Sequence, residues 1–487
     1  MEKKKKRIRP IKWIAMILWI LQLIATAVFC VLVVKAGVLP ALLLGIALLG
    51  VWLLAAIVGL LVLIQEGKKR KGTVRRVIAS VLAILIIIAT VVADNYILTT
   101  LKTLENVSNT KVEKESISVY VLKEDLAESI QDTAGYRYGI LQETDRENTD
   151  KLMAEVEKET GEAVDASEYA DQFALADALK DGEAQAVILN DAFVSMYEDV
   201  EGYEWFAEGT KVLKTAVNEK ELDLSDANKA LPSSFIMYIS GIDTYGGVTE
   251  RSRSDVNIMA VINRDTHEML LVSTPRDYYV PLSVSNGQKD KLTHAGIYGV
   301  EASMGTLEML YGVDINYFFR LNFSGFIDMI DALGGVDVYS EKSFTVEPIA
   351  TYKEGYNHLN GLEALAFARE RYSFSNGDFQ RGKNQMAVIQ AVVQKLTSTA
   401  VLNNYTDIMK SMEDCFQTSL TDADLKELIR QQLENPVSWK ISSMDVTGTG
   451  ARKTTYSMPS RSSSVVIPNM DSVEQAKTEI QRVLAGN

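Results

Sequence analysis

The chain has 487 residues, 47% of them hydrophobic, and a formal net charge of −14. This length leaves room for two or three domains with cores of their own. Its acidity argues against nucleic acid as a partner, and its two cysteines suggest neither a disulfide scaffold nor a zinc site.

Three long apolar runs come before residue 100, at residues 13–34, 38–64 and 77–97. A helix that rises about 1.5 Å per residue needs about 20 residues to cross the hydrocarbon core of a membrane. Each run is long enough and nearly free of charge, which predicts three transmembrane helices. A cleaved signal peptide is the competing interpretation of the first run, but that run is too long and two more follow.

The basic residues predict the orientation of these helices. Seven Lys and Arg precede the first run and six lie between the second and third, whereas the turn after the first run carries only Lys35. Because basic loops stay in the cytoplasm, the N-terminus is expected inside and the rest of the chain after the third run outside. This predicts a multi-pass protein of the cell membrane whose larger, C-terminal part is extracytoplasmic.

The charge is divided unevenly between these two parts. Residues 1–76 carry 14 Lys and Arg against 2 Asp and Glu, which leaves 36 basic and 62 acidic residues for the remainder. Because the outer part is acidic overall, a local group of arginines there is informative about function.

After a polar stalk at residues 100–115, the pattern predicts a small α/β accessory domain without a recognisable chemical motif. Strand patterns occur at 119–122, 138–141 and 186–189, and helical patterns at 148–159 and 169–179. A linker at 223–234 separates this domain from the next.

A second α/β domain, with helices layered on both faces of a sheet, is predicted from residue 235 onward. Its expected strands are 235–240, 256–263, 269–273, 317–323 and 336–339. Its expected helices are 292–311, 326–333, 361–368 and 379–396. A helix at 406–434, a strand at 464–467 and a helix at 471–484 follow. The predicted domains are 1–99 (membrane helices), 100–230 (accessory), 231–400 (catalytic) and 401–487 (an extension that completes the catalytic domain).

Two carboxylates flank a predicted turn between strands. Asp243 directly follows one strand and Asp255 directly precedes the next, with Arg253 beside it. Two such carboxylates suit a magnesium ion, which takes the rest of its ligands from substrate phosphates and water. The alternative is that each Asp caps a turn and that Arg253 forms a surface ion pair.

Basic residues also follow a later strand. Arg276 stands after Pro275, which stiffens the turn, and Lys289 and Lys291 precede an expected helix, where an anion is favoured. A solvated charged loop is the alternative.

The most informative group spans two helices. Arg369 and Arg371 follow an apolar helix, and Asp378, Arg381 and Gln385 share one face of the next helix because of their spacing. Arginine guanidinium groups bind phosphate oxygens in a bidentate manner. This group therefore predicts a phosphate site, although arginines on an exposed helix can simply be solvated.

Five ordered segments resemble the LytR-CpsA-Psr family over residues 235–400. These are SRSDVNIMAVINRDTHEMLLVSTPRDYYV, KLTHAGIYGVEASMGTLEMLYG, NYFFRLNFSGFIDMIDALGGVDVY, GYNHLNGLEALAFARERY and GDFQRGKNQMAVIQ. The closing VVIPN and VEQAK segments are similar to the family's C-terminal tail. Multiple spans followed by an accessory domain are similar to its capsule-type members.

The resemblance implies a phosphotransferase that moves a teichoic acid or capsular polysaccharide from undecaprenyl pyrophosphate to peptidoglycan. It implies an apolar channel for the lipid tail and Mg²⁺ (or Mn²⁺) on the pyrophosphate. By motif position, Asp243 and Asp255 are the implied metal ligands. The implied pyrophosphate clamp is Arg253, Arg276, Arg369, Arg371 and Arg381, supported by Asp378 and Gln385.

One position departs from the family pattern. Many members carry an arginine shortly after the first aspartate, where this chain has Tyr245. Lys289 or Lys291 is the expected substitute contact. Two other functions stay open at this point: a polyprenyl pyrophosphatase, in which water replaces the sugar hydroxyl, and a wall-polymer or lipid-binding or regulatory protein without catalysis.

Overall fold

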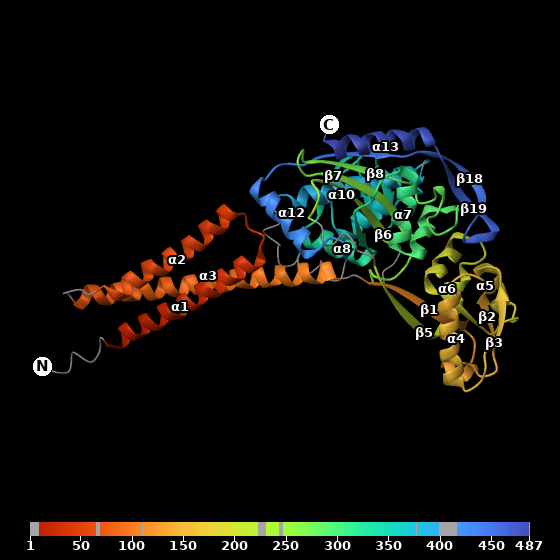
Figure 1. Ribbon diagram of the computed structural model, residues 1–487, viewed down its shortest axis with the longest axis horizontal. Coiled ribbons are helices and arrows are strands. Elements are labelled where there is room, and N and C mark those ends of the chain that lie inside the picture. Colours follow the sequence, from red (N-terminus) through yellow and green to blue (C-terminus); the bar gives the residue numbers. More distant parts are fainter. Residues whose placement is uncertain are drawn as a thin grey trace. The chain divides into compact units, whose positions relative to one another are not determined.

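The computed structural model describes residues 9–64, 69–109, 112–222, 230–242, 247–375, 377–398 and 416–486 (Figure 1). The described residues form two compact units. The first contains the N-terminal helices together with α12 (Asp422–Glu434), and the second contains the two sheet domains.

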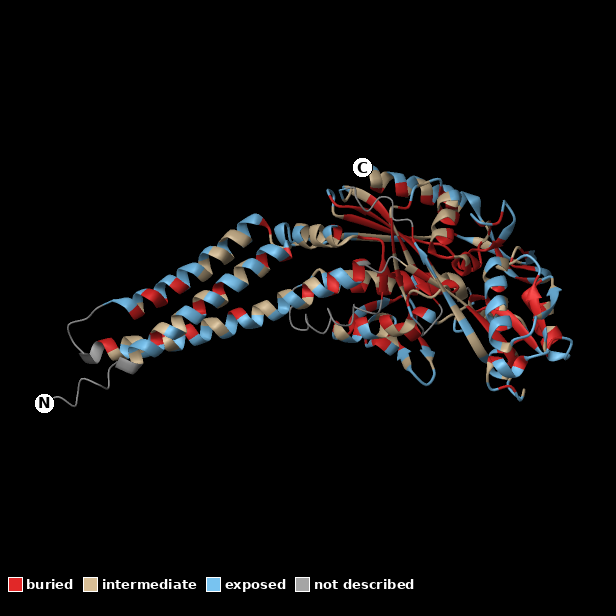
Figure 2. Ribbon diagram, turned by 60° about the horizontal axis from the view of Figure 1, so that its bottom comes forward, coloured by how far each residue is buried: buried red, intermediate tan, exposed pale blue. Residues whose placement is uncertain are grey.

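Three apolar helices dominate the first unit: α1 (Arg9–Ala36), α2 (Ala41–Leu63) and α3 (Lys69–Asn109). Each is long and apolar enough to cross a membrane, and their large apolar side chains are mostly exposed (Figure 2). Where α1 packs on α2, the Trp19 ring fills the space that a Cβ at Gly59 would need. The three predicted apolar helices are therefore present.

The predicted stalk is different in the structure. Helix α3 continues to Asn109, and the first strand already begins at Val112. The segment LKTLENVSN has polar side chains but also good helix formers and no Gly or Pro, so the helix does not end where its apolar run ends.

The accessory domain has a five-stranded mixed sheet in the order β3-β2-β4-β1-β5. Its elements are β1 (Val112–Leu122), η1 (Ile130–Thr133), β2 (Arg137–Leu141), α4 (Arg146–Thr160), β3 (Asp165–Tyr169), α5 (Gln172–Lys180), β4 (Ala186–Asn190), η2 (Asp191–Asp199), α6 (Trp205–Gly209) and β5 (Thr210–Glu221). The central strands β1 and β4 pair antiparallel, Ile117 with Asn190 and Val121 with Ala186. The three predicted strands are confirmed, and β3 and β5 are additional.

The second domain is built on a six-stranded mixed sheet in the order β16-β11-β6-β7-β8-β17. Its strands are β6 (Ser234–Ile242), β7 (Ser254–Asn263), β8 (Glu268–Ser273), β11 (Tyr317–Leu321), β16 (Phe416–Thr418) and β17 (Lys440–Asp445). The two edge strands β16 and β17 both follow residue 415. Residues 416–418 were expected in a helix, but they pair antiparallel with β11.

Helices cover both faces of this sheet, as the sequence predicted. They are η3 (Leu292–Tyr298), α7 (Val300–Tyr311), α8 (Phe323–Ala332), α9 (Gly361–Arg369), α10 (Gly377–Leu396) and α13 (Met470–Ala485). Short strands complete the domain: β9 (Tyr279–Pro281), β10 (Lys289–Lys291), β12 (Val336–Ser340), β13 (Phe344–Val346), β14 (Ala350–Tyr352), β15 (Gly355–Leu359), β18 (Gly448–Thr455) and β19 (Met458–Pro468).

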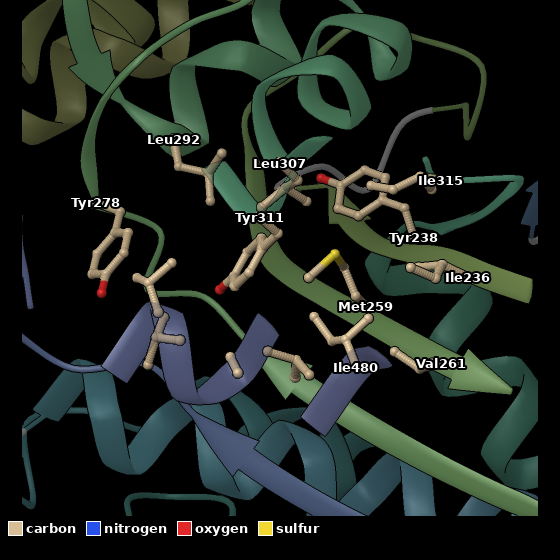
Figure 3. Close-up of a cluster of buried hydrophobic side chains, with 14 of the residues drawn as sticks. Ile236, Tyr238, Met259, Val261, Tyr278, Leu292, Leu307, Tyr311, Ile315 and Ile480 are labelled. Carbon is tan, nitrogen blue, oxygen red and sulfur yellow. The ribbon is translucent and has the colours of Figure 1, made fainter. Parts of the chain in front are cut away.

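One face of the sheet carries the main hydrophobic core (Figure 3). Tyr238 and Met259 from the strands pack with Leu307 and Tyr311 of α7 and with Ile480 of α13. The buried tyrosine hydroxyls have partners: Tyr238 donates to Asn257 Oδ1 at 2.7 Å, and the Tyr311 hydroxyl lies 2.8 Å from that of Thr274. Successive side chains of a strand point to opposite faces, so Ile239 points away from this core.

Candidate functional site

A cavity of about 460 Å³ lies on the opposite face of the six-stranded sheet, beneath α8, α9 and α10. Part of its wall is apolar and comes from strands, helices and the β13–β14 segment. These apolar residues are Ile239, Val256, Leu321, Phe323, Phe326, Val346, Ile349, Leu362, Leu365, Ala366, Ala368, Val388 and Ile389. The rest of the wall is charged: Glu198, Arg253, Asp255, Arg276, Arg369, Glu370, Arg371 and Arg381, with the polar Asn322, Tyr372 and Gln385.

An ion pair joins two neighbouring strands at the charged part. Asp255 stands at the start of β7, and Arg276 follows the end of β8. Nη1 of Arg276 lies 2.7 Å from Oδ1 and 2.7 Å from Oδ2 of Asp255, and the Thr293 hydroxyl donates to Oδ1 at 3.4 Å. Charge-assisted hydrogen bonds of this kind fix the guanidinium in one orientation.

Arg253 is almost fully buried, with 2% of its surface exposed. Its backbone lies against Gly296 of η3 so closely that a Cβ there would come within 2.5 Å of the Ser252 carbonyl oxygen. Nη2 of Arg253 lies 3.6 Å from Oε2 of Glu198, a residue of the accessory domain. The site therefore includes side chains from both sheet domains.

Two further arginines of the cavity lie at the C-terminal end of helix α9 and just after it. Asn360 and Glu363 form a capping box that starts this helix, and Arg369 lies in its last turn with its guanidinium 4.1 Å from the centre of the Phe323 ring. Arg371 follows, 4.7 Å from the centre of the Tyr372 ring and 2.6 Å from the Tyr372 hydroxyl. Aromatic faces attract guanidinium groups and hold them at the edge of the cavity.

The first turns of α10 lie close to strand β8. A Cβ at Gly382 would be 2.7 Å from Ser273 Oγ, so this glycine permits the approach that brings its neighbour Arg381 to the cavity. Nη2 of Arg381 pairs with Oδ1 of Asp378 at 3.0 Å, and Gln385 lies one turn further on.

Burial lowers the pKa of the Arg381 guanidinium. Asp378 and Asp255 raise it, and the positive charges of Arg276 and Arg371 lower it. The group remains a cation because an arginine pKa lies far above neutrality. Burial also works to lower the pKa of Arg371, but Tyr372 and Asp378 outweigh it and the net shift is upward.

The structure brings most of the predicted site residues together. Seven of them line one cavity: Arg253, Asp255, Arg276, Arg369, Arg371, Arg381 and Gln385. Asp378 contacts Arg381 and borders the smaller hollow behind it. Asp243 and Tyr245 lie outside the described residues.

The two predicted lysines lie elsewhere. Lys289 and Lys291 belong to β10 and do not line the cavity. Lys289 lies over the Tyr279 ring at 5.6 Å, and the buried Lys291 lies 3.5 Å from Asp277. The pairing of β10 with β9 turns both lysines toward these partners.

Within the described ranges, no group of three or more His, Cys, Asp or Glu side chains is placed to hold a metal ion. Asp255 supplies an oxygen donor at the cavity, which fits a hard cation that takes few protein ligands. Sequence reasoning missed Glu198, which belongs to no local motif, and gave no role to Glu370, although it lies in the segment GYNHLNGLEALAFARERY. The family resemblance implied an apolar channel, but no residue was assigned to its wall.

Comparisons with known proteins identify the family of this chain. The model of the LytR_cpsA_psr family matches residues 197–481, more than half of the chain. A model described as DNA polymerase processivity factor matches residues 69–189, about a quarter of the chain, starting within the apolar helix α3.

Two relatives are polyisoprenyl-teichoic acid–peptidoglycan teichoic acid transferases named TagU. The one from Bacillus cereus is 35% identical over 229 residues, which cover 46% of this chain and 73% of the relative. The one from Enterococcus faecalis is 32% identical over 220 residues, which cover 45% of this chain and 71% of the relative.

Solved structures with some likeness include TagV from B. subtilis, at 25% identity and a TM-score of 0.45, covering 52% of this chain and 99% of that chain. Another is TagT bound to LI-WTA, at 25% identity and a TM-score of 0.42, covering 55% of this chain and 94% of that chain. At such TM-scores the likeness adds no support of its own. On its family-model match and its relatives, this chain belongs to the LytR-CpsA-Psr family.

Proposed function

We propose that the chain is a membrane-anchored phosphotransferase that moves an anionic glycopolymer, of the teichoic acid or capsular polysaccharide type, from undecaprenyl pyrophosphate to peptidoglycan. One observation carries the proposal: a single cavity combines four buried or half-buried arginines, Arg253, Arg276, Arg371 and Arg381, with an extended apolar wall. Such a cavity matches a molecule with a diphosphate at one end and a hydrocarbon chain at the other. The names of the TagU relatives support the same chemistry.

The apolar wall is the binding surface for the prenyl chain. Phe326, Leu365 and Ile389 come from three different helices and face the same space. Burial of apolar carbon contributes about 25 cal/mol per Å², so a long prenyl chain gains affinity from each isoprene unit that enters. The three apolar helices keep the protein in the membrane that holds such a lipid.

The arginines neutralise the diphosphate and stabilise its transition state. A hydroxyl oxygen of the peptidoglycan sugar attacks the phosphorus on the sugar side, a new P–O bond forms, and the bond to the bridging oxygen breaks. Undecaprenyl phosphate leaves with the bonding electrons, the hydroxyl proton passes to water, and negative charge accumulates on the phosphoryl oxygens. Phosphoryl transfer depends mainly on positioning and charge neutralisation, which fixed guanidinium groups supply.

A magnesium ion is part of the proposal, with Asp255 as a ligand. When bound, the ion would add positive charge to the diphosphate oxygens. Both carboxylate oxygens of Asp255 accept hydrogen bonds from Arg276. Each oxygen keeps a further lone pair, so Asp255 can orient Arg276 and bind a cation at the same time. Asp243, the other expected ligand, lies outside the described residues.

The test is turnover of a polyprenyl-diphosphate-linked glycopolymer by the full chain in lipid nanodiscs, with and without peptidoglycan. A glycopolymer joined to peptidoglycan through a phosphodiester, with release of polyprenyl phosphate, is the expected result. Equal release of polyprenyl phosphate in the absence of peptidoglycan would instead identify a pyrophosphatase. Saturable binding without any turnover would identify a binding protein.

A further inference from the structure

The accessory domain contributes a charged residue to the candidate site. Among the described residues that line the cavity, Glu198 comes from that domain, at the end of η2. Its side chain is 62% exposed, whereas that of its partner Arg253 is 2% exposed. An exposed carboxylate therefore faces a buried guanidinium.

The segment that carries Glu198 is firmly held. Phe193, Met196 and Tyr197 of η2 are buried in a core that also includes Ile297 and Met458 of the second domain. The Tyr197 hydroxyl donates to the Gln172 carbonyl at 2.6 Å. The backbone next to Glu198 is thus anchored across both domains, whereas its side chain is exposed to solvent.

The charges around Arg253 explain what this side chain can do. The Glu198 carboxylate lies 3.6 Å from Arg253. A phosphate that binds the same guanidinium must compete with this carboxylate, because both are anions and need the same donors.

We propose that Glu198 is a displaceable counter-ion of Arg253 that sets how tightly the site holds a prenyl diphosphate. The inference rests on the proposed function. A phosphate of the donor replaces the carboxylate, which turns toward solvent and repels the bound anion from there. After transfer the carboxylate returns to Arg253 and favours release of the prenyl phosphate, so the accessory domain acts as part of the donor site.

The direct test measures the Kd for geranylgeranyl diphosphate with the full chain in nanodiscs, in the presence of Mg²⁺. Glu198→Gln keeps the shape and removes the charge, and we expect its Kd to fall about two- to fivefold, the size of an exposed ion pair. Inorganic diphosphate should show the same ratio, since the effect acts on the phosphates. In turnover, KM for the donor should fall and inhibition by prenyl phosphate should strengthen.

The matched control is Glu201→Gln, an exposed carboxylate two residues past η2 that does not line the cavity. Its Kd should equal that of the wild type. A purely structural role for Glu198 predicts the opposite sign, with weaker binding and a lower melting temperature.

An unchanged or higher Kd for Glu198→Gln, measured against a wild type that binds, overturns this inference and leaves the proposed function in place. A wild type that does not bind geranylgeranyl diphosphate at all overturns both.

Discussion

Arg276 holds both carboxylate oxygens of Asp255 through a single nitrogen, Nη1, at 2.7 Å each. Asp255 lies on β7 and Arg276 in the loop after the neighbouring strand β8, so the pair ties the start of β7 to that loop. Both side chains are largely buried. This pair fixes the charged part of the cavity, and its disruption should disturb the site without removing any apolar contact.

Asp255→Asn replaces the carboxylate by an amide of nearly the same shape. Arg276 then loses the carboxylate that its Nη1 contacts, and the proposed cation loses a ligand. We expect kcat/KM for transfer to fall about 100-fold or more, the cost of losing one well-placed electrostatic group. Steady-state kinetics at several Mg²⁺ concentrations measure this, with the exposed Asp265→Asn as the control. Wild-type rates for Asp255→Asn would exclude a role in transfer.

Arg381→Ala should reduce transfer by at least about 100-fold while the protein stays folded, and Arg381→Lys should recover only part of the loss. Lysine restores one charge but cannot bind two phosphate oxygens side by side. Kinetics with the glycopolymer donor test this. Lys383→Gln, on the same helix but paired with Glu341 at the surface, provides the comparison and should keep normal activity.

Ile389→Trp should weaken binding of the prenyl chain without affecting binding of the diphosphate. A larger side chain in the apolar wall leaves less room for the prenyl chain. We expect the Kd for a long-chain prenyl diphosphate to rise about tenfold, while the Kd for inorganic diphosphate stays the same. If both constants changed equally, the wall would not be the lipid site.

A buried ion pair joins the two sheet domains. Nη1 of Arg320 lies 2.7 Å from Oε1 of Glu113, and the two side chains are 2% and 1% exposed. Glu113→Gln leaves a buried guanidinium without its counter-ion, which should reduce the free energy of unfolding by about 3–5 kcal/mol. Chemical unfolding in detergent measures the loss. The exposed pair Lys220–Glu301 supplies the control, because Glu301→Gln should cost less than about 1 kcal/mol.

Asp445 gives a prediction for pH. It lies at the end of β17 close to Gly382, and burial raises its pKa to about 6, with Glu341 raising it and Lys383 lowering it. The folded state thus binds this proton more tightly than the unfolded state does. The stability that this proton contributes is complete below pH 3.8 and is lost as the pH rises past 6. Asp445→Asn cannot ionise, so its melting temperature should exceed that of the wild type at pH 8 and match it near pH 3.8.

The central strands were predictable because their residues form unbroken apolar runs. Strands β6, β7 and β8 are nearly all buried, so the pattern marks them clearly. Strand β5 was missed because it mixes charged, polar and apolar residues without a regular pattern at the edge of its sheet. Strand β16 was missed because it is three residues long and gains its structure only by pairing with β11.

The arginines of the site were predictable because motif order places them at strand and helix ends. The positions of Lys289 and Lys291 were not, since they depend on a short hairpin whose pairing has no clear pattern. Glu198 was not predictable either. Its role depends on packing between two domains, and the nearest signal in its own segment is a group of apolar residues that anchors η2.

The Arg320–Glu113 pair also constrains how such proteins can be rearranged in evolution. Arg320 belongs to β11 and Glu113 to β1, on either side of the predicted linker at residues 223–234. A recombination breakpoint in that linker would bring together halves that had not been selected as a pair, and a lone guanidinium would then face a foreign surface. The two halves should therefore be inherited together.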